Sequence, residues 1–188
     1  MIRRTRTWER LAAVLPALML LWSAQAGSQG VTAPALKAAF LFNFAKFAEW
    51  PSGTLPPGQR LSLCVVGDKA VADALEQTIK GRDVDHHELT VEVITADGPI
   101  RSCHLVYVSG LDTKQTGQLL ESLKNTSVLT VGDGDQFAAM GGIAQLVLEN
   151  GRMRFAVNVG AAHRANLTIS SKLLSLATIV KDDGDVHR

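Results

Sequence analysis

Hydrophobic and polar residues alternate along this chain with two different periods. The run LSLCVV at 61–66 and the run HLVYV at 104–108 are apolar and rich in β-branched residues, which predicts buried strands, and residues 89–95 alternate as a half-buried strand does. Elsewhere the apolar residues recur at helical spacing, which predicts helices over residues 33–50, 70–80, 113–124 and 169–181. Asp68 follows the first strand and is expected to cap the helix that begins at residue 70.

The second half of the chain adds turn signals to this alternation. A short strand at 127–131 precedes Gly132-Asp133-Gly134-Asp135, which predicts a tight turn followed by a helical turn over 135–140. Apolar segments flank Asn150-Gly151, a strong signal of a two-residue β-hairpin. Strands that alternate with helices are typical of an α/β layered domain. The sequence therefore predicts a single α/β domain with a mixed, largely parallel sheet flanked by helices and a C-terminal antiparallel hairpin.

The first residues differ in composition from the rest of the chain. A basic start with four arginines precedes an apolar run at 11–22, and small residues in an A-x-A arrangement end at Ala26. The run is shorter than the roughly 20 apolar residues that span a bilayer. We therefore expect residues 1–26 to be a cleaved signal peptide and residues 27–188 to form an exported domain with no membrane insertion after cleavage.

The charge of the predicted exported domain is nearly balanced. Of the 19 Lys and Arg and the 18 Asp and Glu in the chain, four arginines and one glutamate precede the expected cleavage point, so the remainder carries a formal charge of −2. The sequence shows no basic stripe of the kind that follows a phosphate backbone, which argues against a nucleic-acid partner.

Cys64 and Cys103 are the two cysteines of the sequence, and both follow the expected cleavage point. An even count in an exported chain predicts a disulfide, with two buried free thiols as the alternative. His104 stands beside Cys103 at the start of a predicted strand. It is interpreted either as a core histidine with satisfied hydrogen bonds or as a neighbour of the thiol.

The stretch FLFNFAKFAEWP at 40–51 holds four of the six phenylalanines in the chain. On a helix, one narrow arc contains Leu36, Phe40, Phe44 and Phe47, which predicts the core face. Phe42 projects from the far side, between Lys46 and Glu49. Two interpretations remain open for Phe42: another segment of this chain covers it, or it forms a partner or dimer surface with Lys46 and Glu49.

The sequence contains no recognisable catalytic arrangement. The Gly132–Asp135 turn lacks the Lys-Ser/Thr of a phosphate-binding loop. His86 and His87 are adjacent, and neighbouring residues of a strand point to opposite faces, so they make a poor metal site. Gly67-Asp68 and Ser109-Gly110 each follow a strand, where they either line a ligand cleft or form turns and caps. We expect no enzymatic activity, no metal and no cofactor.

Several further segments occur together and in order along the chain. They are FNFAKF and EWP within 42–51, LCVVGD at 63–68, SCHL at 102–105, LTVGD at 129–133, GIAQLVLENGRMRF at 142–155 and ISSKLL at 169–174. This combination resembles the YfiR family of bacterial periplasmic proteins and covers nearly all of residues 27–188. The resemblance implies a mixed sheet flanked by helices, frequent dimers and a disulfide at the positions of Cys64 and Cys103. A second cysteine pair that some members carry is absent from this sequence.

The resemblance also implies a regulatory binding protein. The namesake of the family represses an inner-membrane diguanylate cyclase by binding its periplasmic domain, which lowers cyclic di-GMP and biofilm formation. We therefore expect a periplasmic repressor whose partner is the periplasmic domain of an inner-membrane protein, with a diguanylate cyclase as the expected target and a homodimer as a further association. A small-ligand sensor, or an accessory protein of a membrane sensor kinase, is the alternative. The single crosslink is also expected to link binding to the redox state of the periplasm.

Overall fold

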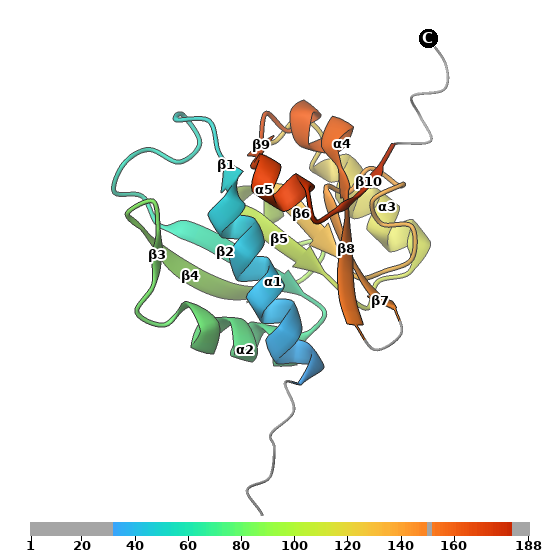
Figure 1. Cartoon of the computed structure of the whole chain (residues 1–188), viewed down its shortest axis with the longest axis horizontal. Coiled ribbons are helices and arrows are strands. Elements are labelled where there is room, and N and C mark those ends of the chain that lie inside the picture. The colour runs from blue at the N-terminus through green and yellow to red at the C-terminus, as the bar shows by residue number, and fades with distance from the viewer. Residues whose placement is uncertain (1–31, 150–151, 182–188) are drawn as a thin grey trace, which may run out of the picture. The chain divides into compact units, whose positions relative to one another are not determined.

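The computed structural model describes residues 32–149 and 152–181, along which strands and helices alternate (Figure 1). The strands are β1 (Ala48–Glu49), β2 (Leu61–Val66), β3 (Asp83–Val84), β4 (His87–Ile94), β5 (Leu105–Val108), β6 (Leu129–Gly132), β7 (Ala144–Glu149), β8 (Arg152–Asn158), β9 (Thr168–Ile169) and β10 (Thr178–Val180). The helices are α1 (Ala33–Phe47), α2 (Lys69–Ile79), the 3₁₀ helix η1 (Ile100–Ser102), α3 (Thr113–Ser122), α4 (Val159–Arg164) and α5 (Ser171–Leu174). The expected signal peptide and the Asn150-Gly151 turn lie outside the described residues.

One mixed sheet organises these elements in the order β10-β8-β7-β6-β5-β2-β4-β3, and β1 and β9 form a separate antiparallel pair. Between the described residues of the sheet, five strand pairings are parallel, and the pairings β3–β4 and β7–β8 are antiparallel. The predicted α/β class, with a largely parallel mixed sheet and a C-terminal hairpin, is confirmed. No helix in the described part of the chain has the length and apolar character needed to cross a bilayer.

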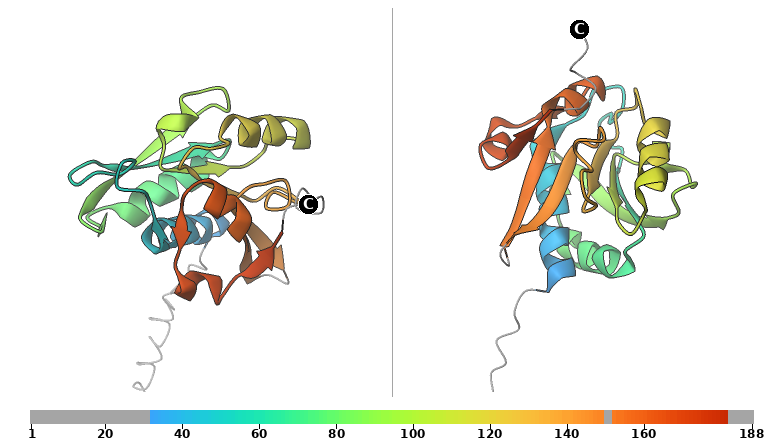
Figure 2. Two further views of the ribbon diagram at one scale, coloured as in Figure 1. Left: turned by 90° about the horizontal axis from the view of Figure 1, so that it is seen from above. Right: turned by 90° about the vertical axis from the view of Figure 1, so that its right-hand side faces the viewer.

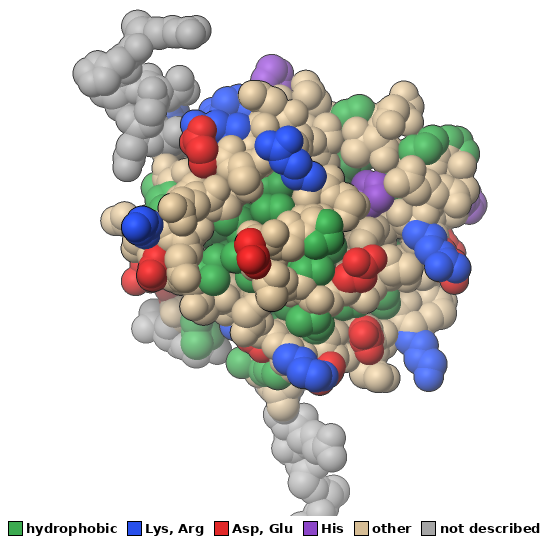
Figure 3. All heavy atoms as spheres, turned by 180° about the vertical axis from the view of Figure 1, so that it is seen from behind, with side chains coloured by type: hydrophobic (Ala, Val, Ile, Leu, Met, Phe, Trp, Pro, Cys, Tyr) green, Lys and Arg blue, Asp and Glu red, His purple; other side chains and the backbone are tan. Residues whose placement is uncertain are grey.

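Helices cover both faces of the sheet (Figure 2). The face under α1 and α2 contributes Leu63 and Val65 of β2 to the larger core, and the opposite face, under α3 and η1, contributes Cys64 and Val66 to a second core. Because successive strand residues point to opposite faces, a strand buried on both sides reads as one continuous apolar run. Acidic and basic side chains are interspersed on the α3 face (Figure 3).

Several local predictions agree closely with the structure. The strand β2 has the predicted bounds, and Asp68 caps α2 by accepting a hydrogen bond from the backbone N–H of Val71 at 3.1 Å. Glu149 of β7 pairs with Arg152 of β8, as a two-residue hairpin requires. These features depend on local periodicity and turn chemistry.

The helix predicted over residues 169–181 is wrong. Only the short helix α5 forms there, and Thr178–Val180 forms the strand β10, which lies parallel to β8 at the edge of the sheet. The β-branched run Thr178-Ile179-Val180 favours an extended backbone, and the edge of β8 supplies hydrogen-bond partners for it. The local apolar stripe carried no information about that open edge.

The segments on either side of the hairpin also differ from the prediction. The helical turn predicted over 135–140 forms only as an isolated turn, in which the backbone N–H of Met140 donates to the carbonyl of Gln136 at 2.8 Å. No helix develops from it, and Gln136 has a φ of 58°, which a helix does not adopt. The helix α4 was not predicted. Asn158 caps it, since its side-chain oxygen accepts the backbone N–H of Ala161 at 2.8 Å.

The helix α1 ends at Phe47, before the predicted end at residue 50, because Ala48 and Glu49 pair with β9 instead. Its predicted core face is also wrong in part. The fully buried positions include Ala38, Leu41 and Ala45, whereas Leu36, Phe40 and Phe47 are only partly buried. The helix packs closely against α2, and Phe44 of the predicted face is buried. The ring centroids of Phe40 and Phe44 lie 5.8 and 5.3 Å from that of Phe155.

Phe42 lies on the side of α1 that the chain itself covers. Its side chain is 9% exposed and belongs to the larger core, and the guanidinium of Arg82, which follows α2, lies 5.1 Å from the ring centroid. Asn43, next to it, is exposed. The structure therefore agrees with the first interpretation of Phe42, in which another segment of the chain covers its side chain.

Replacing Phe42 by Ser is expected to lower the free energy of unfolding by about 3 kcal/mol, because the change removes a buried ring and leaves a cavity. Urea denaturation followed by circular dichroism measures this loss. The matched control Asn43→Ser changes an exposed neighbour and is expected to shift the free energy by less than about 0.5 kcal/mol. Equal stability of the two variants would show that the ring of Phe42 is not part of the core.

Candidate functional site

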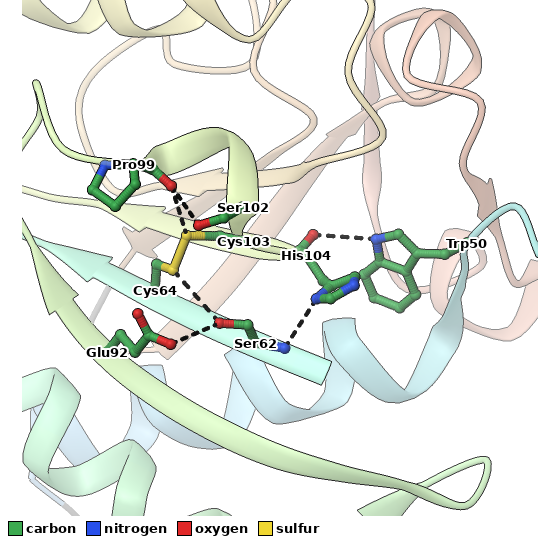
Figure 4. Close-up of a disulfide and its surroundings, with 8 residues drawn as sticks. All are labelled: Trp50, Ser62, Cys64, Glu92, Pro99, Ser102, Cys103 and His104. Atoms are coloured by element: carbon green, nitrogen blue, oxygen red, sulfur yellow. Dashed lines mark hydrogen bonds between the residues drawn. A yellow bond between two sulfur atoms is a disulfide. The ribbon is translucent and has the colours of Figure 1, made fainter. Parts of the chain in front are cut away.

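The disulfide between Cys64 and Cys103 joins the centre of β2 to the residues that lead into β5 (Figure 4). The two Cα atoms are 6.0 Å apart, and the bond closes a loop with a sequence separation of 39. Both cysteines are buried, with 0% and 4% exposure. The connection from β4 to β5 contains only the short η1, so the crosslink holds this brief segment against the α3 face of the sheet.

His104, next to Cys103, uses every polar group that it has. Its backbone N–H donates to the carbonyl of Ser62 at 2.9 Å, and its own carbonyl accepts from the backbone N–H of Leu129 at 2.8 Å and from Nε1–H of Trp50 at 3.2 Å. The imidazole Nδ1 accepts the backbone N–H of Ser62 at 3.0 Å, and Nε2 lies 3.3 Å from the carbonyl oxygen of Thr54. One residue therefore connects β2, β6, Trp50 and the loop at 51–60.

The direction of these hydrogen bonds sets the protonation state of His104. A backbone N–H only donates and a carbonyl only accepts, so Nδ1 carries no proton and Nε2 carries one. Burial lowers the pKa of His104 below its ordinary value of 6.5, the hydrogen bond to Thr54 raises it, and the nearby His87 lowers it further. His104 is therefore the satisfied core histidine of the first interpretation.

A second polar cluster lies at the carboxyl ends of β2, β5 and β6. Lys37 of α1 lies 2.5 Å from Oδ2 of Asp133, and its Nζ is also 3.7 Å from Asp68. The same carboxylate oxygen of Asp133 accepts hydrogen bonds from Tyr107 at 2.8 Å and from Ser109 at 3.2 Å. The cluster fastens the N-terminal half of α1 to this edge of the sheet.

Mutual hydrogen bonding shifts the titration of this cluster. Burial lowers the pKa of Lys37, but the interactions with Asp133 and Tyr107 outweigh burial and raise it. Burial raises the pKa of Asp133, yet the hydrogen bonds from Lys37 and Tyr107 outweigh it and hold that pKa below its ordinary value. Burial raises the pKa of Tyr107 to about 12. At neutral pH the cluster is a lysine–carboxylate ion pair that a neutral tyrosine supports.

The cluster occupies the place where an α/β sheet commonly binds ligands. The chain passes from β2 to β4 on one side and adds β5 on the other, so the strand order reverses between β2 and β5. At this point a Cβ on Gly67 would lie 2.0 Å from the carbonyl oxygen of Ser109, which shows how closely the two turns approach. Gly67-Asp68 and Ser109-Gly110 thus act as tight turns and a helix cap, and Lys37 and Asp133 lie beside them.

The sequence alone did not reveal this cluster. Its available signals were a lysine within the apolar first half of a predicted helix and a tyrosine, the only one in the chain, within a buried strand. Neither signal says which acid the lysine meets, because Lys37 and Asp133 are 96 positions apart.

The residues predicted to contact a partner lie at the other end of α1. Lys46 is exposed, with Nζ 5.9 Å from the ring centroid of Phe47, and Glu49 is exposed on β1, where it pairs with Thr168. The ring of Phe42 is covered, so these three side chains do not form one continuous exposed patch. A role of Lys46 and Glu49 in partner binding stays a prediction.

The remaining polar candidates stay apart. His86 lies in the turn between β3 and β4, and Nδ1 of His87 is 2.7 Å from the carbonyl oxygen of Gln59. Within residues 32–149 and 152–181, no three His, Cys, Asp or Glu side chains are grouped so as to hold a metal ion. A pocket of about 200 Å³ lies between α3 and α4, over Leu120 and Ile143.

Removing the disulfide in the variant Cys64→Ala/Cys103→Ala is expected to lower the free energy of unfolding by about 4 kcal/mol, because the open chain gains loop entropy when it unfolds. Urea denaturation of the oxidised protein and of the variant measures the difference. Because both sulfurs are buried, the folded wild type is expected to resist reduction by dithiothreitol until it unfolds. Equal denaturation midpoints for oxidised protein and variant would contradict this account.

Replacing Lys37 by Met is expected to lower the free energy of unfolding by about 2 kcal/mol at pH 7, because it leaves Asp133 partly buried without its ion pair. The pKa of Asp133 is lowered in the folded state, so the stabilisation is present above its unfolded value of 3.8 and is lost as the pH falls through the folded value. The difference between wild type and variant should therefore shrink in acid. The control Lys69→Met removes an exposed pair with Asp73 and should change little.

The comparisons with known proteins agree with this architecture. Residues 34–178 match the family model described as YfiR/HmsC-like. No curated protein matches the chain. Among solved structures, the chain is similar to a conserved domain protein from Vibrio cholerae O1 biovar El Tor, with 13% identity over 80% of this chain and 60% of that one and a TM-score of 0.48.

It is also similar to an ABC domain in complex with L-Trp from Streptococcus pneumonia, with 12% identity over 78% of this chain and 60% of that one and a TM-score of 0.52. The chain thus spans about 60% of the length of each of these two proteins. At such low identity the second likeness shows the α/β fold alone. The family model, in contrast, extends from the start of α1 into β10, and the chain therefore belongs to the YfiR/HmsC-like family.

Proposed function

We propose that this protein is a periplasmic regulatory binding protein that represses an inner-membrane signalling protein, with a diguanylate cyclase as its target. The observation that carries the proposal is the match to the YfiR/HmsC-like family over residues 34–178. Repression requires only that the protein binds one conformation of the external domain of the target more tightly than the other, which shifts the target toward its inactive state. Lower production of cyclic di-GMP and less biofilm follow.

The polar chemistry of the domain supports a binding role rather than a catalytic one. Both ring nitrogens of His104 are engaged within the fold, and the carboxylate of Asp133 is shared by Lys37, Tyr107 and Ser109. These groups stabilise the domain and are not arranged as a nucleophile beside a base. Recognition then depends on the outer surface.

We place the contact with the target at the C-terminal end of α1. Lys46 and Glu49 are exposed there and carry opposite charges. The ring of Phe42 lies on the covered side of the helix, where it contacts the guanidinium of Arg82. Charged groups at the rim of an interface guide association and set its specificity. The covered ring of Phe42 keeps this end of α1 in a fixed position.

Deleting the protein from its host is expected to raise cyclic di-GMP and biofilm mass, and expression of the exported wild-type chain should reverse both changes. Mass spectrometry of nucleotide extracts measures the first effect. Removing the diguanylate cyclase in the same strain should abolish the rise. An unchanged cyclic di-GMP level together with altered autophosphorylation of a membrane sensor kinase would contradict the cyclase target and favour the kinase alternative.

The binding surface is tested within the same design. The double variant Lys46→Glu/Glu49→Lys should weaken binding to the purified periplasmic domain of the cyclase by roughly tenfold in calorimetry, or about 1.4 kcal/mol. The control Lys114→Glu reverses one exposed charge on α3 and should leave the affinity unchanged. If the double variant keeps the wild-type affinity, the target binds elsewhere on the domain. That result would not contradict the repressor function itself.

A further inference from the structure

The loop at 51–60, between β1 and β2, is held to the sheet by two imidazoles. His104 approaches the carbonyl oxygen of Thr54 through Nε2 at 3.3 Å, and His87 approaches the carbonyl oxygen of Gln59 through Nδ1 at 2.7 Å. A carbonyl only accepts, so each contact requires a proton on that ring nitrogen. Among the described residues, the backbone N–H groups of Thr54, Leu55 and Gln59 bond to carbonyls within the loop itself.

The two imidazoles respond to acid in different ways. A proton added to His87 leaves its Nδ1–H in place, so the contact with Gln59 survives. His104 already carries its proton on Nε2, and its Nδ1 accepts the backbone N–H of Ser62 at 3.0 Å. A second proton, on Nδ1, would place an N–H donor of the ring opposite the N–H donor of Ser62. That hydrogen bond would be lost, and the N–H of Ser62 would lose its acceptor.

The position of His104 explains why its ring is used in this way. Ser62 lies near the start of β2, opposite the point where η1 has ended and β5 has not yet begun. The carbonyl of Ser62 accepts the backbone N–H of His104, but its own N–H bonds to the imidazole. The imidazole thus substitutes for a strand carbonyl at the end of the parallel ladder, and Figure 4 shows it between Ser62 and Trp50.

The surroundings of His104 offer little compensation for a positive charge. On β4, His87 would repel it when protonated, and Glu92 accepts the hydroxyl of Ser62 at 3.4 Å rather than the ring. At the start of β2, Arg60 is paired with Glu88. Glu49 of β1 is exposed. Cys103, just before His104, does not titrate because it is in the disulfide. The hydrogen-bond partners of the His104 ring in the described structure are both backbone groups, so no acidic side chain offsets a charge on the ring through a hydrogen bond.

The direction of the pH effect follows from the titration of His104. Burial lowers the pKa of this imidazole in the folded protein, whereas the unfolded chain binds the proton near pH 6.5. Between that value and the lower folded value the unfolded state carries more protons, so the folded arrangement loses stability as the pH falls. Well above pH 6.5 the imidazole is neutral in both states and the arrangement is intact.

We propose that His104 is an acid-sensitive clasp: at neutral pH its ring links the loop at 51–60 to the start of β2, and in acid its hydrogen bond to Ser62 is lost. The ring stays bonded to Thr54 through Nε2–H, so acid separates the ring and the middle of the loop together from Ser62, while His87 keeps the end of the loop at Gln59 attached. The loop adjoins a pocket of about 280 Å³ that is lined in part by Trp50, Leu55 and Glu49. The clasp therefore sets the shape of the surface beside the C-terminal end of α1, and it operates whatever the identity of the bound partner.

The variant His104→Gln tests the clasp directly. A glutamine amide can accept from Ser62 and donate to Thr54, as the neutral imidazole does, but it does not titrate. In the wild-type exported protein, hydrogen exchange at the Ser62 amide, corrected for intrinsic rates, should accelerate at least tenfold from about pH 8 to about pH 5. In His104→Gln the protection should be independent of pH.

Two further variants make the test decisive. His163→Gln replaces an exposed histidine on α4 and should keep the wild-type profile, and His87→Gln should alter the Gln59 end of the loop without removing the pH dependence at Ser62. His104→Leu removes both hydrogen bonds and should leave Ser62 unprotected at every pH. Constant protection in the wild type, or a pH dependence that persists in His104→Gln, would overturn the proposal.

Discussion

The fold depends on how the residues just before β5 are attached to the start of β2. The chain reaches this point through η1, which is too short to cover the sheet as a crossover helix would. Two attachments replace that cover: the disulfide from Cys103 to Cys64 and the hydrogen bonds of His104 to both backbone groups of Ser62. Because the carbonyl of His104 also accepts from Leu129 and Trp50, the same residue sets the register of β6 and the position of the chain after α1.

The helix α1 and the residues just after it are consequently attached at both ends of the strands. At the carboxyl ends of the strands Lys37 pairs with Asp133, and at the amino ends Trp50 donates a hydrogen bond to His104. The two ties use different chemistry. The first is a partly buried ion pair that neutral Tyr107 supports, and the second is a neutral hydrogen bond beside a disulfide. Together they hold α1 in place over the switch point of the sheet.

This arrangement is consistent with membership of a regulatory family. A domain whose interior polar groups are satisfied keeps a rigid framework, and its outward residues can change without loss of the fold. The C-terminal end of α1 and the loop at 51–60 lie next to the attachment at His104. Conditions that alter this attachment therefore act on the same region that we assign to partner contact.

Local periodicity and turn chemistry determined a large share of this structure before any tertiary contact was known. The apolar run of β2, the cap at Asp68, the hairpin around Asn150-Gly151 and the pairing of Cys64 with Cys103 follow from residues that act on their neighbours or from cysteine count and family pattern. Tertiary structure alone decided the rest. The residues of β10 became a strand because β8 offered an open edge, Phe42 was buried because the segment after α2 covers its ring, and Lys37 met Asp133 because the strand ends converge there. Each of these outcomes depends on partners distant in the chain, which a sequence pattern does not encode locally.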